Sequence, residues 1–236
     1  MTFIEQFDRE WAPRLGPRRD TFRATFDYLA RRRPAGHLIV ETGCARQADN
    51  WEGDGQSTCM FDRFAEAHGG DVYTVDINPA SCDYARSIVG SRTRVFSEDS
   101  VPFLNRIGAE LRAAGRQIDL LYLDSFDWDP ANPVPSALHH LKELCAIAPA
   151  LTPGTLVVVD DSFHALRGFP TGQTYTLLED QGIAGKALFV AQYFQQIGVP
   201  LAFDTYRWEI WIEPRLTPKG SELELAAELV GLLGPA

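Results

Sequence analysis

The chain has no excess of basic residues, no paired cysteine motif and no long apolar run, and each absence excludes a class of protein. Its 22 Lys and Arg against 32 Asp and Glu give a net charge of -10. Nucleic acid is therefore not an expected partner, because binding its phosphates requires a basic face. The four cysteines form no CxxC pair and have no histidines at metal-binding spacing, which argues against zinc and redox motifs. Without about 18 consecutive apolar residues, no membrane span is expected.

The same absences indicate one domain in a reducing compartment. Scattered thiols suit such a compartment, and the acidic Glu5 and Asp8 interrupt any apolar core of a secretory signal, so we expect a cytoplasmic protein. No repeat or Pro/Gly/Ser-rich linker divides the 236 residues. We expect a helical segment over 1–35 and the main domain over 36–236. Whether the first residues form a lid or a dimer arm, and whether the protein is a homo-oligomer, stays open.

Apolar runs that alternate with helical patterns predict the fold class. Five runs lie at 38–42, 72–76, 93–96, 118–124 and 155–159, and two short runs at 201–203 and 208–212 are too close for a parallel crossover. The pattern predicts an α/β fold. Its sheet is expected to be a doubly wound, Rossmann-like, mostly parallel sheet of seven strands with helices on both faces and a C-terminal antiparallel hairpin.

The run at 38–42 stops at an acidic residue and a glycine, Glu41 and Gly43, and leads through a long polar loop at 45–54 to Ser57. A parallel strand delivers a loop to a ligand in this way, at the carboxyl edge of a sheet. The segment therefore predicts the first part of a nucleotide-type site. Ser57 or Thr58 is expected to cap the next helix.

Polar residues follow the next two predicted strands. Asp76, followed by Ile77, is placed to accept hydrogen bonds from ribose hydroxyls. Asp99 can accept a hydrogen bond from an exocyclic amine such as that of adenine, and Ser100 can donate to a ring nitrogen. Asp76 and Asp99 would equally serve as helix caps, and this alternative stays open.

Three acids stand at the ends of the fourth and fifth predicted strands, namely Asp124, Asp160 and Asp161. Carboxylates that converge at one sheet edge repel one another unless they are protonated or bridged, and Mg²⁺ with oxygen ligands is the simplest bridge. In the alternative interpretation these acids only cap loops and helix starts.

The order of these motifs resembles the class I S-adenosylmethionine-dependent methyltransferases over roughly residues 36 to 213. The likeness rests on Glu41-Thr-Gly43, Asp76, the Glu98-Asp99-Ser100 segment and the closing hairpin. Asp124 with Asp160 and Asp161 is similar to the metal triad of Mg²⁺-dependent O-methyltransferases of the catechol and antibiotic-sugar types. Two departures are the stretched loop between Gly43 and Gly55 and an acid, Asp127, where catechol enzymes have a lysine base.

The resemblance implies transfer of a methyl group from the sulfonium of S-adenosylmethionine to a hydroxyl of a small molecule such as a sugar or secondary metabolite. It implies cofactor contacts by residues at the strand ends, Glu41, Gly43, Ser57, Asp76, Ile77, Asp99, Ser100 and Asp124. The metal would lower the pKa of the acceptor hydroxyl, and a base would complete proton removal. Asp127 is the first candidate for that base and His164 the second.

Three alternatives remain. The same fold could methylate without metal, with Asp160 and Asp161 as structural or substrate-binding acids. It could also be a methyltransferase-like binding protein without turnover. A dinucleotide oxidoreductase is disfavoured, because no GxGxxG follows the first strand and a terminal hairpin is out of place there.

Overall fold

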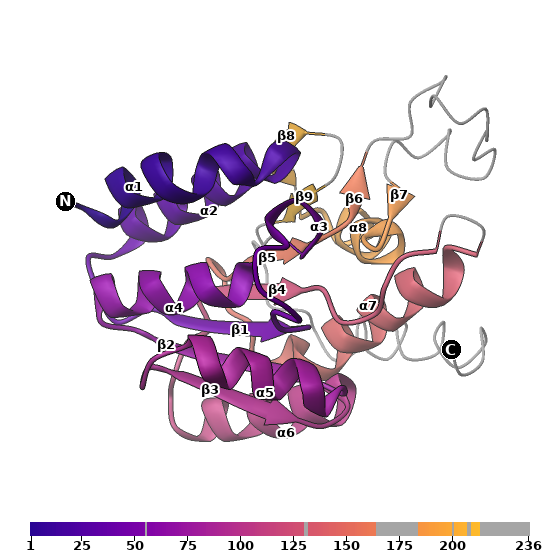
Figure 1. The fold of residues 1–236 in the computed structure, drawn as a ribbon. Helices are drawn as coiled ribbons and strands as arrows, with labels where there is room; N and C mark the ends of the chain where they lie inside the picture. Colours follow the sequence, from indigo (N-terminus) through magenta and orange to yellow (C-terminus); the bar gives the residue numbers. More distant parts are fainter. Residues whose placement is uncertain (55, 130–131, 164–183, 200, 207–208, 213–236) are drawn as a thin grey trace, which may run out of the picture.

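A computed structural model of the chain describes all residues except 55, 130–131, 164–183, 200, 207–208 and 213–236 (Figure 1). The helix predicted at 221–233 and the candidate base His164 lie outside the described residues. In the part of the chain that is described, no helix is both long and apolar enough to cross a membrane.

Within the described residues one main sheet has seven strands in the order β3-β2-β1-β4-β5-β9-β8. The strands are β1 (Leu38–Thr42), β2 (Asp71–Asp76), β3 (Thr93–Ser97), β4 (Leu120–Leu123), β5 (Leu156–Val159), β8 (Leu201–Tyr206) and β9 (Glu209–Ile212). The first five are parallel, which confirms the predicted α/β class with a parallel sheet. β9 pairs antiparallel with both β5 and β8.

The strand order reverses between β1 and β4. β2 and β3 lie to one side of β1, whereas β4 and β5 lie to the other. In an open α/β sheet, the loops at such a point separate and leave a crevice beyond the carboxyl ends of the strands. Here the residues that follow β1, β2, β3 and β4 include residues that line cavities at this edge of the sheet.

Helices cover both faces of the sheet (Figure 1). They are α1 (Phe3–Gln6), α2 (Arg19–Arg32), α3 (Trp51–Asp54), α4 (Ser57–His68), α5 (Pro79–Ile88), α6 (Ser100–Ala113), α7 (Val134–Ile147) and α8 (Leu188–Gln196), with short η1 (Phe7–Trp11), η2 (Ala12–Arg14), η3 (Gly16–Arg18) and η4 (Ala148–Ala150).

Alternate residues of each central strand join different cores, as the period-two geometry of a strand requires. Val40 and Leu121 pack with α6, α7 and α8, whereas Ile39 and Tyr122 pack with α1, α2 and α4. Both faces of β4 and β5 are buried along their whole length, which explains their nearly continuous apolar sequence.

The N-terminal segment belongs to the second of these cores. Phe7 and Leu15 have no exposed surface, and Phe3 and Trp11 are buried. The Phe3 ring meets the rings of Phe26 on α2 and of α4's Phe64 edge to face, with centroids 4.8 and 5.2 Å away. Residues 3–15 therefore form part of the wall over the sheet rather than a separate lid or arm.

Candidate functional site

Two adjoining cavities lie at the carboxyl edge of the sheet. The larger, of about 510 Å³, is lined by Val75, Asp76, Ile77, Asp99, Ser100, Val101, Pro102, Ser125, Phe126, His139 and Lys142. The smaller, of about 180 Å³, is lined by Gly43, Cys44, Arg46, Asp54, Ser57, Asp76, Ile77, Asn78, Ser81, Asp124, Ser125 and Asp127. Asp76, Ile77 and Ser125 line both, so the cavities form one elongated space that passes the end of β2.

All but one of the eight predicted cofactor residues line this space. Gly43, Ser57 and Asp124 lie at the smaller cavity, Asp99 and Ser100 at the larger, and the β2-end pair Asp76 and Ile77 at both. The exception is Glu41, whose side chain is completely buried beneath the loop.

Gly43 is required where the loops after β1 and β4 come together. Its φ is +78°, and a Cβ atom at this position would lie 2.3 Å from the backbone oxygen of Asp124. The backbone N–H of Asp124 donates to the carbonyl of Thr42 at 2.9 Å, which continues the pairing of β4 with β1. A side chain at position 43 would push apart the two loops that form the floor of the smaller cavity.

Glu41 ties β1 to the start of α4. The hydroxyls of Ser57 and Thr58 donate to its two carboxylate oxygens at 2.6 and 2.8 Å. Burial raises the pKa of Glu41 to about 7, although the hydroxyl donors oppose the rise. α4 begins at Ser57, so the N-cap position falls on Gln56, with φ +52°, whose side chain makes no capping hydrogen bond; this corrects the predicted capping role of Ser57 or Thr58.

The carboxylates of Asp76 and Asp99 accept hydrogen bonds from backbone N–H groups near the ends of β2 and β3. Asp76 accepts from the backbone N–H of Asn78 at 2.7 Å and from that of Cys44 at 3.2 Å. Asp99 is the N-cap of α6 and accepts from the N–H of Val101 at 2.8 Å, as the capping alternative had it. Each carboxylate still borders a cavity, so capping does not remove it from the candidate site.

The larger cavity has aromatic and apolar walls that sequence patterns did not reveal. Ile77 and Phe126 are 71% and 41% exposed, which is unusual for large apolar side chains, and both border the space. His139 also lines it and hydrogen-bonds Ser100 through Nε2 at 3.1 Å. A position inside a helix suggests a structural role for His139, and helical periodicity alone does not reveal that its side chain borders a cavity.

A buried carboxylate on α7 supports this wall from below. Glu143 accepts from the hydroxyls of Ser125 at 2.6 Å and Thr42 at 3.2 Å. Burial would raise the pKa of Glu143, but hydrogen bonding from His139 and the charges of the neighbouring histidines lower it to about 2. Burial lowers the pKa of His140 to about 4, so that histidine is neutral at neutral pH, in line with its predicted structural role.

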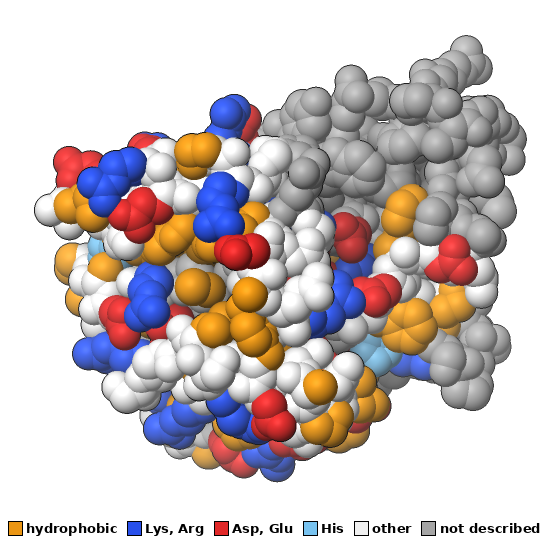
Figure 2. Space-filling model, in the orientation of Figure 1, with side chains coloured by type: hydrophobic (Ala, Val, Ile, Leu, Met, Phe, Trp, Pro, Cys, Tyr) orange, Lys and Arg blue, Asp and Glu red, His pale blue; other side chains and the backbone are white. Residues whose placement is uncertain are grey.

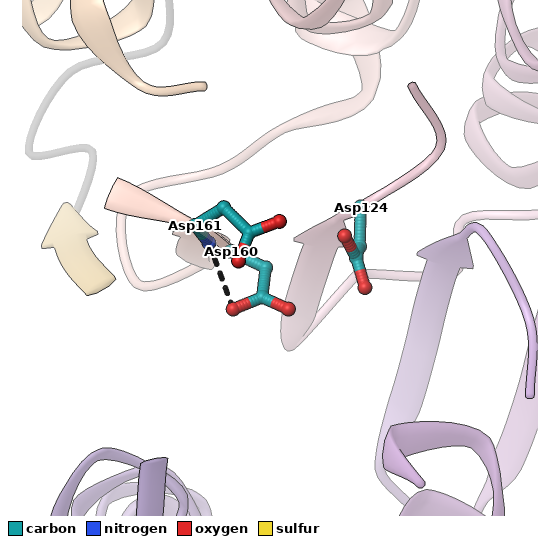
Figure 3. A group of neighbouring side chains, drawn as sticks. All are labelled: Asp124, Asp160 and Asp161. Carbon is teal, nitrogen blue, oxygen red and sulfur yellow. Dashed lines mark hydrogen bonds between the residues drawn. The ribbon is translucent and has the colours of Figure 1, made fainter. Parts of the chain in front are cut away.

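The three acids predicted to bind metal do meet. One carboxylate oxygen from each of Asp124, Asp160 and Asp161 lies within 4.8 Å of the others (Figure 3). Asp124 follows β4, and the other two follow β5, where the N–H of Asp161 donates to Asp160 at 2.8 Å. Asp161 has a φ of +46°, so the chain turns sharply to bring its side chain back toward the cluster.

Two cations of the chain itself bind the triad. The ammonium of Lys186 donates to Asp124 and lies 3.0 Å from Asp161, and the side chain of Lys186 is 1% exposed. The guanidinium of Arg18 donates to Asp160 at 3.2 Å and to Asp161 at 3.0 Å. Neither residue was predicted, because no local sequence pattern links Lys186 to the acids and Arg18 lies about 140 residues away in sequence.

Burial and the neighbouring charges act in opposite directions in this cluster. Burial would lower the pKa of Lys186, but the three surrounding carboxylates raise it above its ordinary value. Burial would likewise raise the pKa of Asp160, but Arg18 and Lys186 together hold it below its ordinary value. For Asp124 burial outweighs the ammonium of Lys186, and its pKa is raised above its ordinary value.

This arrangement does not fit Mg²⁺. The carboxylate oxygens have the right chemistry for that ion. However, an ion at their centre would lie beside the buried ammonium of Lys186, and two like charges in a dry site repel strongly unless one leaves. Metal binding therefore remains a prediction that the side-chain geometry does not favour.

The candidate base Asp127 lies at the rim of the smaller cavity and is mostly exposed. Arg46 donates to both of its carboxylate oxygens, at 2.9 and 3.0 Å, and also pairs with Asp54 at 3.1 Å. Arg46 occupies one acceptor position on each Asp127 oxygen, and the exposed carboxylate keeps a second lone pair on each oxygen for another hydrogen bond. Arg46 thus bridges the long loop after β1 and the loop after β4 across the mouth of the cavity.

Acidic and basic side chains are interspersed over the described part of the face in Figure 2. No extended basic surface faces the viewer in that described part.

The family comparison agrees with this geometry. Residues 52–162, a little under half of the chain, match the family model described as a methyltransferase domain. The matched segment runs from α3 through β5 and so includes the ends of β2, β3, β4 and β5. Over these strand ends the chain is therefore similar to a methyltransferase domain. The comparison with curated proteins gives no significant match.

A solved structure with the same fold is similar to this chain at low identity, and two others have lower TM-scores. An O-methyltransferase family protein from Burkholderia thailandensis is 12% identical, with a TM-score of 0.51 over 86% of this chain and 57% of its own. LepI in complex with S-adenosylmethionine is 12% identical, with a TM-score of 0.48 over 81% of this chain and 46% of its own. The mitomycin 7-O-methyltransferase MmcR is 14% identical, with a TM-score of 0.44 over 92% and 61%. The chain thus spans about half of the length of these proteins.

Proposed function

We propose that this protein is an S-adenosylmethionine-dependent methyltransferase that methylates a hydroxyl group of a small molecule. The observation that carries the proposal is the elongated space at the crevice between β1 and β4. It is lined by Asp76 at its middle, by Asp99 and Ser100 at one end and by Gly43 and Ser57 at the other. The methyltransferase-domain match over the same strand ends supports it.

Different lining residues suit the ribose, adenine and methionine parts of the proposed cofactor. Asp76 stands where both cavities meet, so its carboxylate is placed to accept from the ribose hydroxyls. The exposed apolar side chains of Ile77 and Phe126 offer flat contact to the adenine ring, with Asp99 and Ser100 for its polar edge. The smaller cavity, with backbone from Gly43 and the hydroxyl of Ser57, then takes the methionine part.

Methyl transfer from a sulfonium needs positioning more than acid assistance, because the leaving group is already cationic. The chain must hold the acceptor oxygen in line with the methyl carbon and must exclude water. Asp124 borders the smaller cavity beside the proposed methionine end, so the acceptor hydroxyl would approach near Asp124 and Asp127. Asp127 and His164 remain the predicted bases, and the ion pair with Arg46 would make the Asp127 carboxylate a weaker base.

The sequence favoured a Mg²⁺-assisted form of this reaction. The buried pairing of Lys186 with Asp124 and Asp161 favours the alternative that works without metal. In that form, the acids hold the loops after β4 and β5 in place, and the acceptor is positioned by protein groups alone.

Binding and transfer are tested separately. Isothermal titration calorimetry with S-adenosylhomocysteine is expected to show one site per chain, and Asp76→Ala is expected to weaken it by about 10- to 100-fold, the usual range for lost hydrogen bonds to a charged group. Asp83→Ala, which removes an exposed acid on α5 outside both cavities, is the matched control.

Transfer is measured with methyl-labelled S-adenosylmethionine and a panel of sugars, phenols and secondary-metabolite alcohols. Labelled product from a hydroxyl acceptor supports O-methylation. Product labelled only on nitrogen or carbon would contradict it, and binding without turnover on any acceptor would favour a non-catalytic binding protein. Tight NAD binding with no affinity for S-adenosylhomocysteine would overturn the proposal as a whole.

A further inference from the structure

Lys186 has an environment that is unusual for a lysine. Its side chain is 1% exposed, and its ammonium lies among the carboxylates of Asp124 and Asp161, the latter at 3.0 Å. Lysine is almost never fully buried unless it is paired. Here it occupies the position between strand ends where the sequence pattern predicted a divalent cation.

The backbone is built to hold Lys186 there. It follows β7 (Ala184–Gly185), which pairs antiparallel with β6 (Ser162–Phe163) directly after the acidic pair. The N–H of Lys186 donates to the carbonyl of Asp161 at 3.2 Å, and the next N–H, of Ala187, donates to the hydroxyl of Ser162 at 3.0 Å. The lysine is therefore fixed at both its backbone and its ammonium.

Gly185 makes this close approach possible. Its φ is +83°, and a Cβ atom there would lie 2.0 Å from the carbonyl oxygen of Asp161. A larger residue would separate β7 from the turn at Asp161 and withdraw the ammonium from the triad. Gly185 is therefore needed for the ammonium of Lys186 to reach the triad.

Arg18 completes the charge balance from the opposite side. It comes from η3, at the end of the buried N-terminal segment, and is itself buried. It binds Asp160 and Asp161, whereas Lys186 binds Asp124 and Asp161, so each acid of the triad has a cationic partner within the chain.

We propose that Lys186 supplies at this triad the positive charge that a divalent cation would otherwise supply, so that the native protein closes the triad as an internal ion cluster and binds no Mg²⁺ there. Lys186 is then a positioning residue that fixes the loops after β4 and β5 beside the smaller cavity. The inference concerns the same sheet edge as the proposed function but does not depend on turnover or on the identity of the acceptor.

Binding of Mn²⁺ to the full-length protein, followed by the electron paramagnetic resonance signal of the free ion, tests this directly. Wild type is expected to show no saturable site. Lys186→Met keeps the length of the side chain and removes its charge, which leaves the acids under-compensated. This variant is expected to gain one saturable Mn²⁺ site, with an apparent affinity at least about tenfold above the non-saturable Mn²⁺ binding of wild type. The double variant Lys186→Met with Asp124→Asn is expected to lose the gained site.

Lys142→Met makes the same substitution at a lysine that borders the larger cavity and not the triad, and it is expected to behave as wild type. One saturable Mn²⁺ site in wild type that Asp124→Asn removes would overturn the inference. A folded Lys186→Met variant with no gain in Mn²⁺ affinity would also overturn it. Should that variant fail to fold, the wild-type titration alone decides.

Calorimetry with S-adenosylhomocysteine on the same wild-type sample separates this inference from the proposed function. Cofactor binding together with a saturable Mn²⁺ site removes only the role of Lys186. Absence of both Mn²⁺ and cofactor binding leaves the ion cluster in place and removes the methyltransferase proposal.

Discussion

Replacing the buried Glu41 by glutamine is expected to make the stability of the protein less dependent on pH between about 4.5 and about 7. Glu41 is fully buried, and its pKa is raised from 4.5 to about 7, chiefly by burial. The unfolded chain therefore releases this proton at lower pH than the folded protein does. The stability contributed by the protonated form is fully present below about pH 4.5 and is lost as the pH rises through about 7.

The size of the effect follows from the two pKa values. At about 1.4 kcal/mol per pKa unit, the difference between 4.5 and about 7 corresponds to a loss of about 3 kcal/mol once Glu41 is ionised in both states. Between about pH 5 and about pH 8, wild type should lose on the order of 2 kcal/mol through this group alone. Glu41→Gln keeps the shape and an acceptor oxygen for the hydroxyls of Ser57 and Thr58 but does not titrate.

Urea unfolding followed by tryptophan fluorescence at both pH values measures this difference. The unfolding free energy of wild type relative to Glu41→Gln should fall by about 2 kcal/mol from the lower to the higher pH, because all other titrating groups are common to both proteins. Equal differences at both pH values, within about 0.5 kcal/mol, would refute the reasoning, since Glu41 would then ionise alike in folded and unfolded chains.

Three further changes have expected outcomes. Gly43→Ala would place a Cβ atom 2.3 Å from the backbone oxygen of Asp124 on a left-handed backbone. The unfolding free energy measured in urea should therefore fall by about 2 to 4 kcal/mol. A fall of less than about 0.5 kcal/mol would contradict the required close approach of the two loops. Asp76→Ala should weaken S-adenosylhomocysteine binding about 10- to 100-fold in calorimetry while Asp83→Ala leaves it unchanged, and equal losses would point to a general effect of acid removal. Lys186→Met should lower the unfolding free energy by about 3 to 5 kcal/mol, because it leaves the buried carboxylates without their cation. Added Mn²⁺ should recover part of this loss. A loss that Mn²⁺ leaves unchanged would contradict the idea that a metal ion can replace the ammonium at the triad.

Strand ends could be predicted from the sequence because buried parallel strands are continuous apolar runs with a polar residue where each run stops. This pattern placed Asp76, Asp99 and Asp124 correctly at one edge of the sheet, beside the crevice. The convergence of Asp124 with Asp160 and Asp161 followed from the same rule, since adjacent parallel strands end at the same edge.

The partners of these acids could not be predicted in the same way. Arg18 and Lys186 reach the triad from segments that are remote in sequence, and no local spacing links them to it. A run of three acids indicates that a positive charge must be near, but it does not distinguish a metal ion from an ammonium or guanidinium of the same chain. The pairing of residues 162–163 with 184–185 is what brings Lys186 to the triad, and no sequence pattern foretells it.

Local propensity also gave a wrong prediction where a side chain is used in a tertiary hydrogen bond instead of a helix cap. Ser57 and Thr58 are good capping residues, yet their hydroxyls bind Glu41, which needs donors because it is buried. From the sequence alone, the aromatic N-terminal residues fit a lid and a dimer arm equally well. Phe7 in fact lies in the core, because α2 and α4 leave an apolar groove that its ring fills.

The central claim is that the space between the ends of β1 and β4 binds S-adenosylmethionine without help from a metal. Calorimetric titration of S-adenosylhomocysteine into chelator-treated wild type tests it most directly. The account predicts one binding site per chain, with an affinity that added Mg²⁺ leaves unchanged. No binding after chelation, restored by Mg²⁺, would contradict the metal-free site, and no binding under either condition would contradict the claim entirely.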